Sequence, residues 1–213
     1  MSINVVVDLR NQFGPIRNQH QRPTCMAFAA SDCHAFARGS LDALSAEYAY
    51  FHAVNRQANA DRTQGVSYRA MTETLANDGQ PLESGWPYIA GLQPADPWTP
   101  PATPGTIYRR VTNTIDATPD AIIDALDTSS AVLLGMRISE GFIFLGAAEA
   151  LPPLANEPAA GTHAVMAVGY GELNSERYLL IRNSWGEAWA DHGYGWIHQD
   201  YLAPRLLIAG VMK

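Results

Sequence analysis

The sequence predicts an α+β fold with a helical first half and a β-rich second half. Alanines and apolar residues at helical spacing dominate positions 25–77. Short runs of Val, Ile, Leu and Tyr, separated by Gly, Asn and acidic turns, dominate positions 132–198. Five prolines fall between positions 94 and 104, which excludes helix and interior strand there. We therefore expect this segment to cross between two lobes.

The first helix is expected over residues 25–38. Pro23 and Thr24 suit a turn and a helix N-cap, alanines are strong helix formers, and Gly39 can end the helix. Cys25 would then lie in the first helical turn.

Two further helices are expected in the first half. One lies within residues 41–55, where Ser45 is a candidate N-cap. The other follows Ser67 as its cap and runs through Asn77, with Gly79 as its stop. All three helices should pack together because their apolar residues recur at helical spacing.

The second half is expected to contain one helix and several strands. Thr118, Pro119 and Asp120 form a strong helix start. Period and composition predict an antiparallel sheet or open barrel, to which a short strand near the N-terminus is added. The predicted strands are 4–9, 132–138, 164–170, 178–182 and 194–198.

Composition excludes several classes of partner. Only 16% of the 213 residues are charged and the formal net charge is -7, whereas nucleic acids and anionic membranes require a basic surface. The first eight residues lack a basic signal-peptide region, and no apolar run reaches the roughly 20 residues of a membrane span. The histidines lack zinc-ligand spacing and there is no cysteine cluster, so we expect no metal and no cofactor.

The two cysteines, Cys25 and Cys33, lie eight positions apart on one expected helix. A rise of about 1.5 Å per residue separates them by roughly 12 Å, beyond the approximately 7 Å limit for a disulfide. Cys33 is expected in the core. Cys25 faces the unpaired N–H groups of a helix start, which favour the nucleophilic thiolate, although a small buried apolar role is the alternative.

A cysteine nucleophile needs a base, and the base needs a third group to hold its ring. Among six histidines, His163 opens the apolar run 164–170. A lone histidine at a strand start is more often structural. What favours His163 is the following strand, 178–182, which ends at Asn183 and could place that amide beside the imidazole.

Three blocks of the chain surround these residues: Asn18-Gln19 through Cys25-Met26-Ala27-Phe28-Ala29, Thr162-His163-Ala164-Val165 through Gly169-Tyr170-Gly171, and Ile181-Arg182-Asn183-Ser184-Trp185-Gly186. In these blocks the chain resembles the papain family of cysteine peptidases. The resemblance covers nearly the whole chain in family order. His163 follows Cys25 by 138 positions, inside the family spacing of about 130 to 150, and Asn183 follows at 158, slightly beyond it.

The resemblance implies one papain-like catalytic domain over residues 1–213. Its helical lobe would span approximately 11–105, and its β-rich lobe, an antiparallel barrel, 1–10 and 106–213. The active-site cleft would lie between the two lobes.

The resemblance also implies a role for each site residue. Cys25 and His163 would form a thiolate and imidazolium pair, and Asn183 would orient the ring. Gln19 would aim its amide at the developing oxyanion together with the Cys25 N–H. Three further residues would serve the substrate site: Trp185, shielding the Asn183 to His163 hydrogen bond, and Gln64 and Gly65, lining the groove. The alternatives are a solvated turn for Gln19 and core packing for Trp185.

The chain departs from the family at its nucleophile. The family signature is Cys-Gly-[Ser/Ala]-Cys-[Trp/Tyr], whereas this chain reads Arg22-Pro23-Thr24-Cys25-Met26. The upstream cysteine and its disulfide are missing, so the chain looks like a bacterial-type member without the usual disulfides. Pro23 can stiffen the loop in place of that bridge.

The leading hypothesis is a cysteine endopeptidase that forms an acyl-enzyme on Cys25, with His163 as acid and base. An isopeptidase or acyl transferase on the same fold, and a catalytically silent binding module, are the alternatives. The expected partners are a protein or peptide substrate and a protein inhibitor, since no inhibitory pro-segment is seen. A cytoplasmic location or a delivered effector domain is favoured over conventional secretion.

Overall fold

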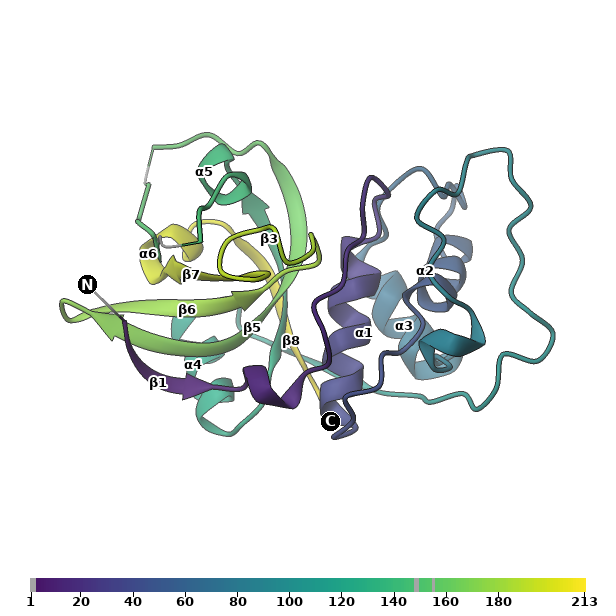
Figure 1. Cartoon of the computed structure of the whole chain (residues 1–213), viewed down its shortest axis with the longest axis horizontal. Coiled ribbons are helices and arrows are strands. Elements are labelled where there is room, and N and C mark those ends of the chain that lie inside the picture. The colour runs from purple at the N-terminus through teal and green to yellow at the C-terminus, as the bar shows by residue number, and fades with distance from the viewer. Residues whose placement is uncertain (1–2, 148–149, 155) are drawn as a thin grey trace.

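The computed structural model describes residues 3–147, 150–154 and 156–213 (Figure 1). Three helices, α1 (Cys25–Ala37), α2 (Ala46–Asn55) and α3 (Tyr68–Asn77), form a helical lobe. The strands lie on the other side of α1, so α1 stands between the sheet and the other two helices (Figure 1). Two short 3-10 helices, η1 (Arg10–Gln12) and η2 (Glu83–Gly85), lie in the connections.

Helix α1 begins at Cys25, as predicted, and ends before Gly39, whose φ of 64° is the left-handed geometry that glycine adopts freely. Thr24 occupies the N-cap position, but its side chain does not cap the helix. Its hydroxyl lies 3.0 Å from the Tyr88 hydroxyl instead. The prediction of a Thr24 side-chain cap was therefore wrong, because a residue distant in the sequence competes for that hydroxyl.

The other predicted caps are confirmed. The Ser45 hydroxyl accepts a hydrogen bond from the Tyr48 N–H at the start of α2. The Ser67 hydroxyl likewise accepts from Ala70 at the start of α3. Helix α4 (Pro119–Asp127) begins after Thr118, with its proline at the first helical position.

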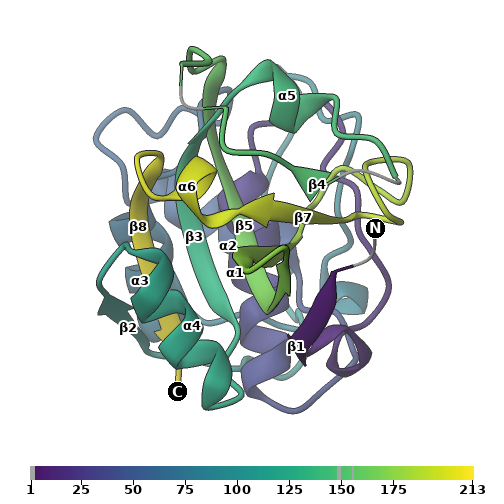
Figure 2. The ribbon, with the colours of Figure 1, turned by 90° about the vertical axis from the view of Figure 1, so that its left-hand side faces the viewer.

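The described residues form one eight-stranded sheet (Figure 2). The strand order is β2-β8-β3-β5-β6-β7-β4, with β1 also paired to β5. All pairs are antiparallel except β4 with β7. The strands are β1 (Asn4–Asp8), β2 (Thr112–Ile115), β3 (Val132–Ile138), β4 (Ala150–Leu151), β5 (Gly161–Leu173), β6 (Glu176–Arg182), β7 (Tyr194–His198) and β8 (Leu206–Met212).

The sheet is antiparallel apart from one pair and does not close into a barrel: among the described strands, β2 and β4 lie at the two ends of the order and do not pair with each other. Strand β5 is longer than predicted because it serves three partners. Its first half pairs with β3, its second half with β1, and a register shift between Ala167 and Gly169 interrupts its ladder with β6. Such an irregularity bends a strand and increases its twist.

Five elements of the second half were not predicted: strands β2, β4 and β8, and the short helices α5 (Glu140–Ile143) and α6 (Gln199–Leu202). Strand β8 follows the predicted strand 194–198 along the chain. The Pro-rich segment 94–104 contains neither helix nor strand, as predicted, and lies on the helical side (Figure 1). Among the described residues, none of the helices has the length and apolar character needed to cross a bilayer.

Helix α1 is the element that joins the two sides. It packs against β5 and β3 on one side and against α2 and α3 on the other. Its small side chains Ala27 and Ala30 are fully buried, which allows close approach of its neighbours. The N-terminal end of α1, with Cys25, is thereby placed where the helices meet the sheet.

Candidate active site

Two distant parts of the chain meet at the corner that follows β6. The Gln19 N–H donates to the Ser184 carbonyl at 2.8 Å, and the Gly186 N–H donates to the Arg17 carbonyl at 3.0 Å. Gly186 has a φ of 77°, which allows the chain to turn here. This pairing brings the segment before Cys25 beside Asn183.

The end of β6 is also held by a buried charge. Arg182 is 3% exposed and donates from Nε to the Asp32 carboxylate on α1 at 2.9 Å. Its Nη2 donates to the Pro15 carbonyl at 2.8 Å. These bonds tie the strand that presents Asn183 to the helix that presents Cys25.

The structure brings His163 and Asn183 together. Nε2 of His163, on β5, lies 2.8 Å from Oδ1 of Asn183, and both side chains are buried. The Ser184 N–H donates to the same Oδ1 at 2.8 Å, which identifies that atom as the amide oxygen. An amide oxygen only accepts, so Nε2 carries the ring proton and Nδ1 is left as the basic nitrogen.

Aromatic side chains cover this pair. The Trp185 ring stacks on the His163 ring with centroids 4.4 Å apart and planes 25° from parallel. Phe142, from α5, meets Trp185 edge-on at 5.9 Å. Trp185 therefore does more than pack in the core: it holds one face of the imidazole.

The Cys25 thiol lies against β5 at the residue that follows His163. Burial raises the pKa of the Cys25 thiol, and the N–H groups of Ala164, Met26 and Cys25 oppose that shift by favouring the thiolate. The side chain remains partly exposed. Cys33, in contrast, is buried, and burial raises its pKa to about 12. Both cysteines are free, as expected.

The pKa of the His163 imidazole is shifted in the opposite direction to that of the Cys25 thiol. Burial lowers the pKa of His163 to about 4, although its hydrogen bond with Asn183 works the other way. Burial thus disfavours a Cys25 thiolate without a positive partner, and equally a His163 imidazolium without a negative one. Proton transfer from the Cys25 thiol to His163 would create two opposite charges, whose attraction is strong where water is excluded.

Gln19 is a buried residue, only 6% exposed, which overturns the solvated-turn alternative. Its Oε1 accepts from the Ser184 hydroxyl at 2.7 Å, and its Nε2 donates to the Arg22 carbonyl at 2.9 Å. These two bonds fix the orientation of the amide. They leave the second Nε2–H without a partner among the residues that the structure describes.

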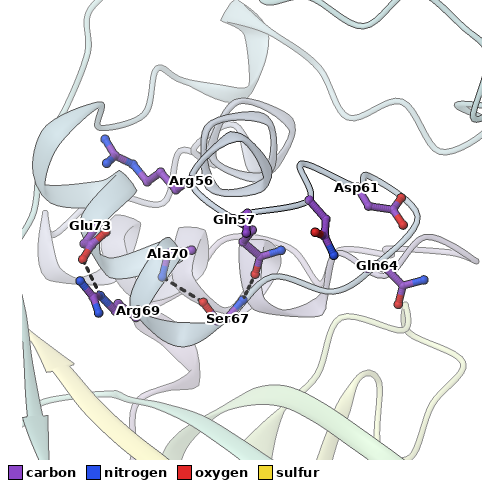
Figure 3. A pocket seen from close by; sticks show the side chains of 10 residues that line it. Arg56, Gln57, Asp61, Gln64, Ser67, Arg69, Ala70 and Glu73 are labelled. Atoms are coloured by element: carbon purple, nitrogen blue, oxygen red, sulfur yellow. Dashed lines mark hydrogen bonds and ion pairs between the residues drawn. The ribbon is translucent and has the colours of Figure 1, made fainter.

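Gln64 and Gly65 lie on a different loop, in the helical lobe, and both are exposed. A Cβ added at Gly65 would lie 3.9 Å from the Pro23 carbonyl, so this loop borders the one that leads to Cys25. Gln64 also borders a surface hollow of about 480 Å³ (Figure 3). Two basic and two acidic side chains line this hollow, and none of Gln19, Cys25, His163, Asn183 and Trp185 does.

The sequence reading missed several residues that hold the site. Ser184 could have been found, because it follows Asn183 directly in the third block. Phe142 carried no signal. Tyr88, whose hydroxyl donates to the Gln19 carbonyl at 2.6 Å, lies 69 positions from Gln19. The described part of the chain holds no group of three or more His, Cys, Asp or Glu side chains suited to a metal ion.

Comparisons with known proteins identify the family of this chain. The family model described as papain family cysteine protease matches residues 3–203. Mouse (Mus musculus) pro-cathepsin H is 27% identical over 189 residues, which cover 86% of this chain and 56% of that protein. Rat (Rattus norvegicus) cathepsin Q is 29% identical over 208 residues, which cover 91% and 58%. The chain thus spans just over half the length of these relatives.

Solved structures share the fold. Xylellain, a cysteine protease from Xylella fastidiosa, superposes with a TM-score of 0.81 at 23% identity, covering 100% of this chain and 87% of that one. A structure from work on the mite allergens Blo t 1 and Der p 1 gives a TM-score of 0.77 at 23% identity, covering 100% and 72%. The fold is papain-like, and with a family model matching nearly the whole length, the chain belongs to the papain family of cysteine proteases.

Proposed function

We propose that this chain is a cysteine endopeptidase that hydrolyses peptide bonds through an acyl-enzyme on Cys25. The observation that carries the proposal is the buried His163 and Asn183 pair, bonded at 2.8 Å and stacked under Trp185, next to the strand residue that faces the Cys25 thiol. A nucleophile, a base and a group that orients the base are the three parts that such a reaction needs.

The reaction begins with transfer of the Cys25 proton to Nδ1 of His163. The thiolate attacks the carbonyl carbon of the substrate, the C–N bond breaks, and His163 returns the proton to the leaving amine. His163 then takes a proton from water, whose oxygen attacks the acyl carbon. The C–S bond breaks, the acid product leaves, and the proton on His163 restores the Cys25 thiol.

Gln19 would serve the negative oxygen that forms during both attacks. Its one free Nε2–H, together with the Cys25 N–H at the start of α1, supplies donors held in place before the reaction. Such preorganisation is valuable because the donors need no rearrangement as charge develops. A binding module would not need an amide held this way.

We further propose that residues 1–213 act as one catalytic domain, with the substrate lying between the helical lobe and the sheet. Gln64 and Gly65 would contribute the helical-lobe side of the groove, since their loop borders Pro23. The proposed partners are a protein or peptide substrate and a protein inhibitor.

Digestion of an unbiased peptide library, read by mass spectrometry, tests the proposal. Cys25→Ala is the inactive variant, and Cys33→Ala is the matched control because that thiol is buried in the core. Internal cleavage by the wild type and by Cys33→Ala, absent from Cys25→Ala, supports an endopeptidase. Cleavage confined to isopeptide-linked substrates, or transfer to added amines, would replace it by one of the alternatives. No turnover of any substrate would favour a binding module.

A further inference from the structure

A buried ion pair lies directly behind the loop that joins Gln19 to Cys25. Arg22, on that loop, donates from Nη1 to Oε2 of Glu47 at 2.6 Å and from Nη2 to Oε1 at 2.9 Å. Arg22 is 8% exposed, and Glu47, in the first turn of α2, is fully buried. Planar two-point pairing of this kind restricts both position and direction of the arginine.

Glu47 also binds the segment that follows η2. The Ile89 N–H donates to Oε2 at 2.9 Å, and Trp98 Nε1–H donates to Oε1 at 2.7 Å. With Arg22, the carboxylate therefore receives four hydrogen bonds from two separate parts of the chain. Each oxygen accepts two of them, so both are fully used.

The same two parts of the chain hold Gln19 from both ends. The Arg22 carbonyl accepts from the Gln19 side-chain amide at 2.9 Å. The Tyr88 hydroxyl donates to the Gln19 backbone carbonyl at 2.6 Å, and Tyr88 directly precedes Ile89. Glu47 thus helps to hold both groups that position Gln19: the Arg22 carbonyl, through the Arg22 side chain, and the Tyr88 hydroxyl, through the neighbouring residue Ile89.

Stability alone does not account for this pair. Taking two charges out of water is costly, and apolar side chains in their place are often as stabilising. Both cysteines of the chain are free, so no covalent bridge tethers this loop. Hydrogen bonds to a buried carboxylate fix the orientation of the groups that donate them, whereas apolar packing does not.

We propose that Glu47 and Arg22 are positioning residues for the Gln19 amide. They hold the loop of residues 19–25 in the geometry in which the free Nε2–H meets the reacting oxygen, and they do so without touching the substrate. The proposal deepens the proposed function, on which its kinetic part rests.

Glu47→Gln is the sharpest test, because it keeps the shape and places an N–H₂ against groups that only donate. We expect kcat per titrated active site to fall about tenfold or more with KM within about threefold, the pattern of a transition-state interaction lost. The rate of Cys25 alkylation by iodoacetamide, which uses no oxyanion donor, should stay within about threefold. Asp78→Asn is the control, since it weakens another ion pair of the helical lobe, in which Arg56 donates from Nε and Nη2 to Oδ2 of Asp78.

A second variant covers the case in which Glu47→Gln leaves Arg22 unpaired and unfolds the protein. Arg22→Met combined with Glu47→Gln removes both charges and keeps one acceptor oxygen, for either Trp98 or Ile89. It should show the same loss of kcat. Unchanged kcat in the folded variants would overturn the proposal, as would an equal fall in alkylation rate. Hydrogen exchange of the 17–28 segment decides independently of substrate: it should quicken in Glu47→Gln and not in Asp78→Asn. A wild type without turnover would refute the proposed function alone, and unaltered exchange would refute the positioning role.

Discussion

Replacing Gln19 with alanine should cost the enzyme most of its turnover and little of its substrate affinity. Loss of one preorganised oxyanion donor lowers kcat by about 10² to 10³, or roughly 3 to 4 kcal/mol of transition-state stabilisation. The structure supports the full figure, because two hydrogen bonds at 2.7 and 2.9 Å already hold the amide before substrate binds. A loosely held side chain would stabilise the transition state less, because it would lose conformational entropy on becoming ordered.

The same substitution should also destabilise the fold. It removes the partners of the Ser184 hydroxyl and the Arg22 carbonyl, and leaving such buried groups unpaired costs on the order of 1 to 3 kcal/mol each. Ser184→Ala separates the two effects: it keeps the Gln19 donor but frees its orientation, so kcat should fall by only about tenfold, as for one lost hydrogen bond.

Steady-state hydrolysis of a cleaved peptide, normalised by active-site titration, measures these effects at a temperature well below unfolding. Alkylation of Cys25 by iodoacetamide in each variant reports whether the thiolate is intact. A Gln19→Ala enzyme that retains kcat within about fivefold of wild type, while alkylating normally, would refute the oxyanion role.

Two more predictions concern the histidines. His34 is fully buried with Nδ1 3.0 Å from Gln80 Oε1, and burial lowers its pKa from 6.5 to about 4. Between pH 6.5 and pH 4, His34 is therefore protonated in the unfolded chain but neutral in the folded protein. The free energy of unfolding should consequently fall as the pH drops from 6.5 toward 4, by on the order of 3 kcal/mol. Urea unfolding across this pH range should show that the free energy of unfolding falls less steeply with pH in His34→Gln. The loss that remains is due to His163, whose pKa is lowered in the same way. The same pH dependence in wild type and His34→Gln would contradict this role of His34. Asn183→Ala should release the His163 ring and lower single-turnover rates by about a hundredfold, as misplacement by an ångström does; a rate equal to wild type would show that Trp185 alone orients the ring.

Local signals were read correctly wherever the partner lies close in sequence. Ser45 and Ser67 cap their helices because the N–H groups that they accept belong to the residues three positions ahead. Thr24 fails the same rule because its hydroxyl meets Tyr88, 64 positions away. Strands β2 and β8 escaped prediction for a similar reason: β2 pairs with β8 and β8 pairs with β3, so both depend on partners distant in the sequence.

The residues of the candidate site likewise fall into those that local sequence predicts and those that depend on contacts between distant parts of the chain. Cys25, His163 and Asn183 were found through short motifs in family order, and the structure places His163 and Asn183 in contact. The residues that hold Gln19 were not foreseen. Its amide depends on Ser184, 165 positions away, and on a loop anchored by Glu47, neither of which has meaning until the chain has folded.

The measurement that bears most directly on the central claim is labelling with an epoxysuccinyl inhibitor of thiol peptidases, read by intact mass. The variants are Cys25→Ala, Cys33→Ala and His163→Ala. A single adduct on the wild type and on Cys33→Ala, absent from Cys25→Ala and much slower in His163→Ala, is the result that an activated Cys25 predicts. A wild type that stays unlabelled, or that labels equally fast without His163, would contradict the account.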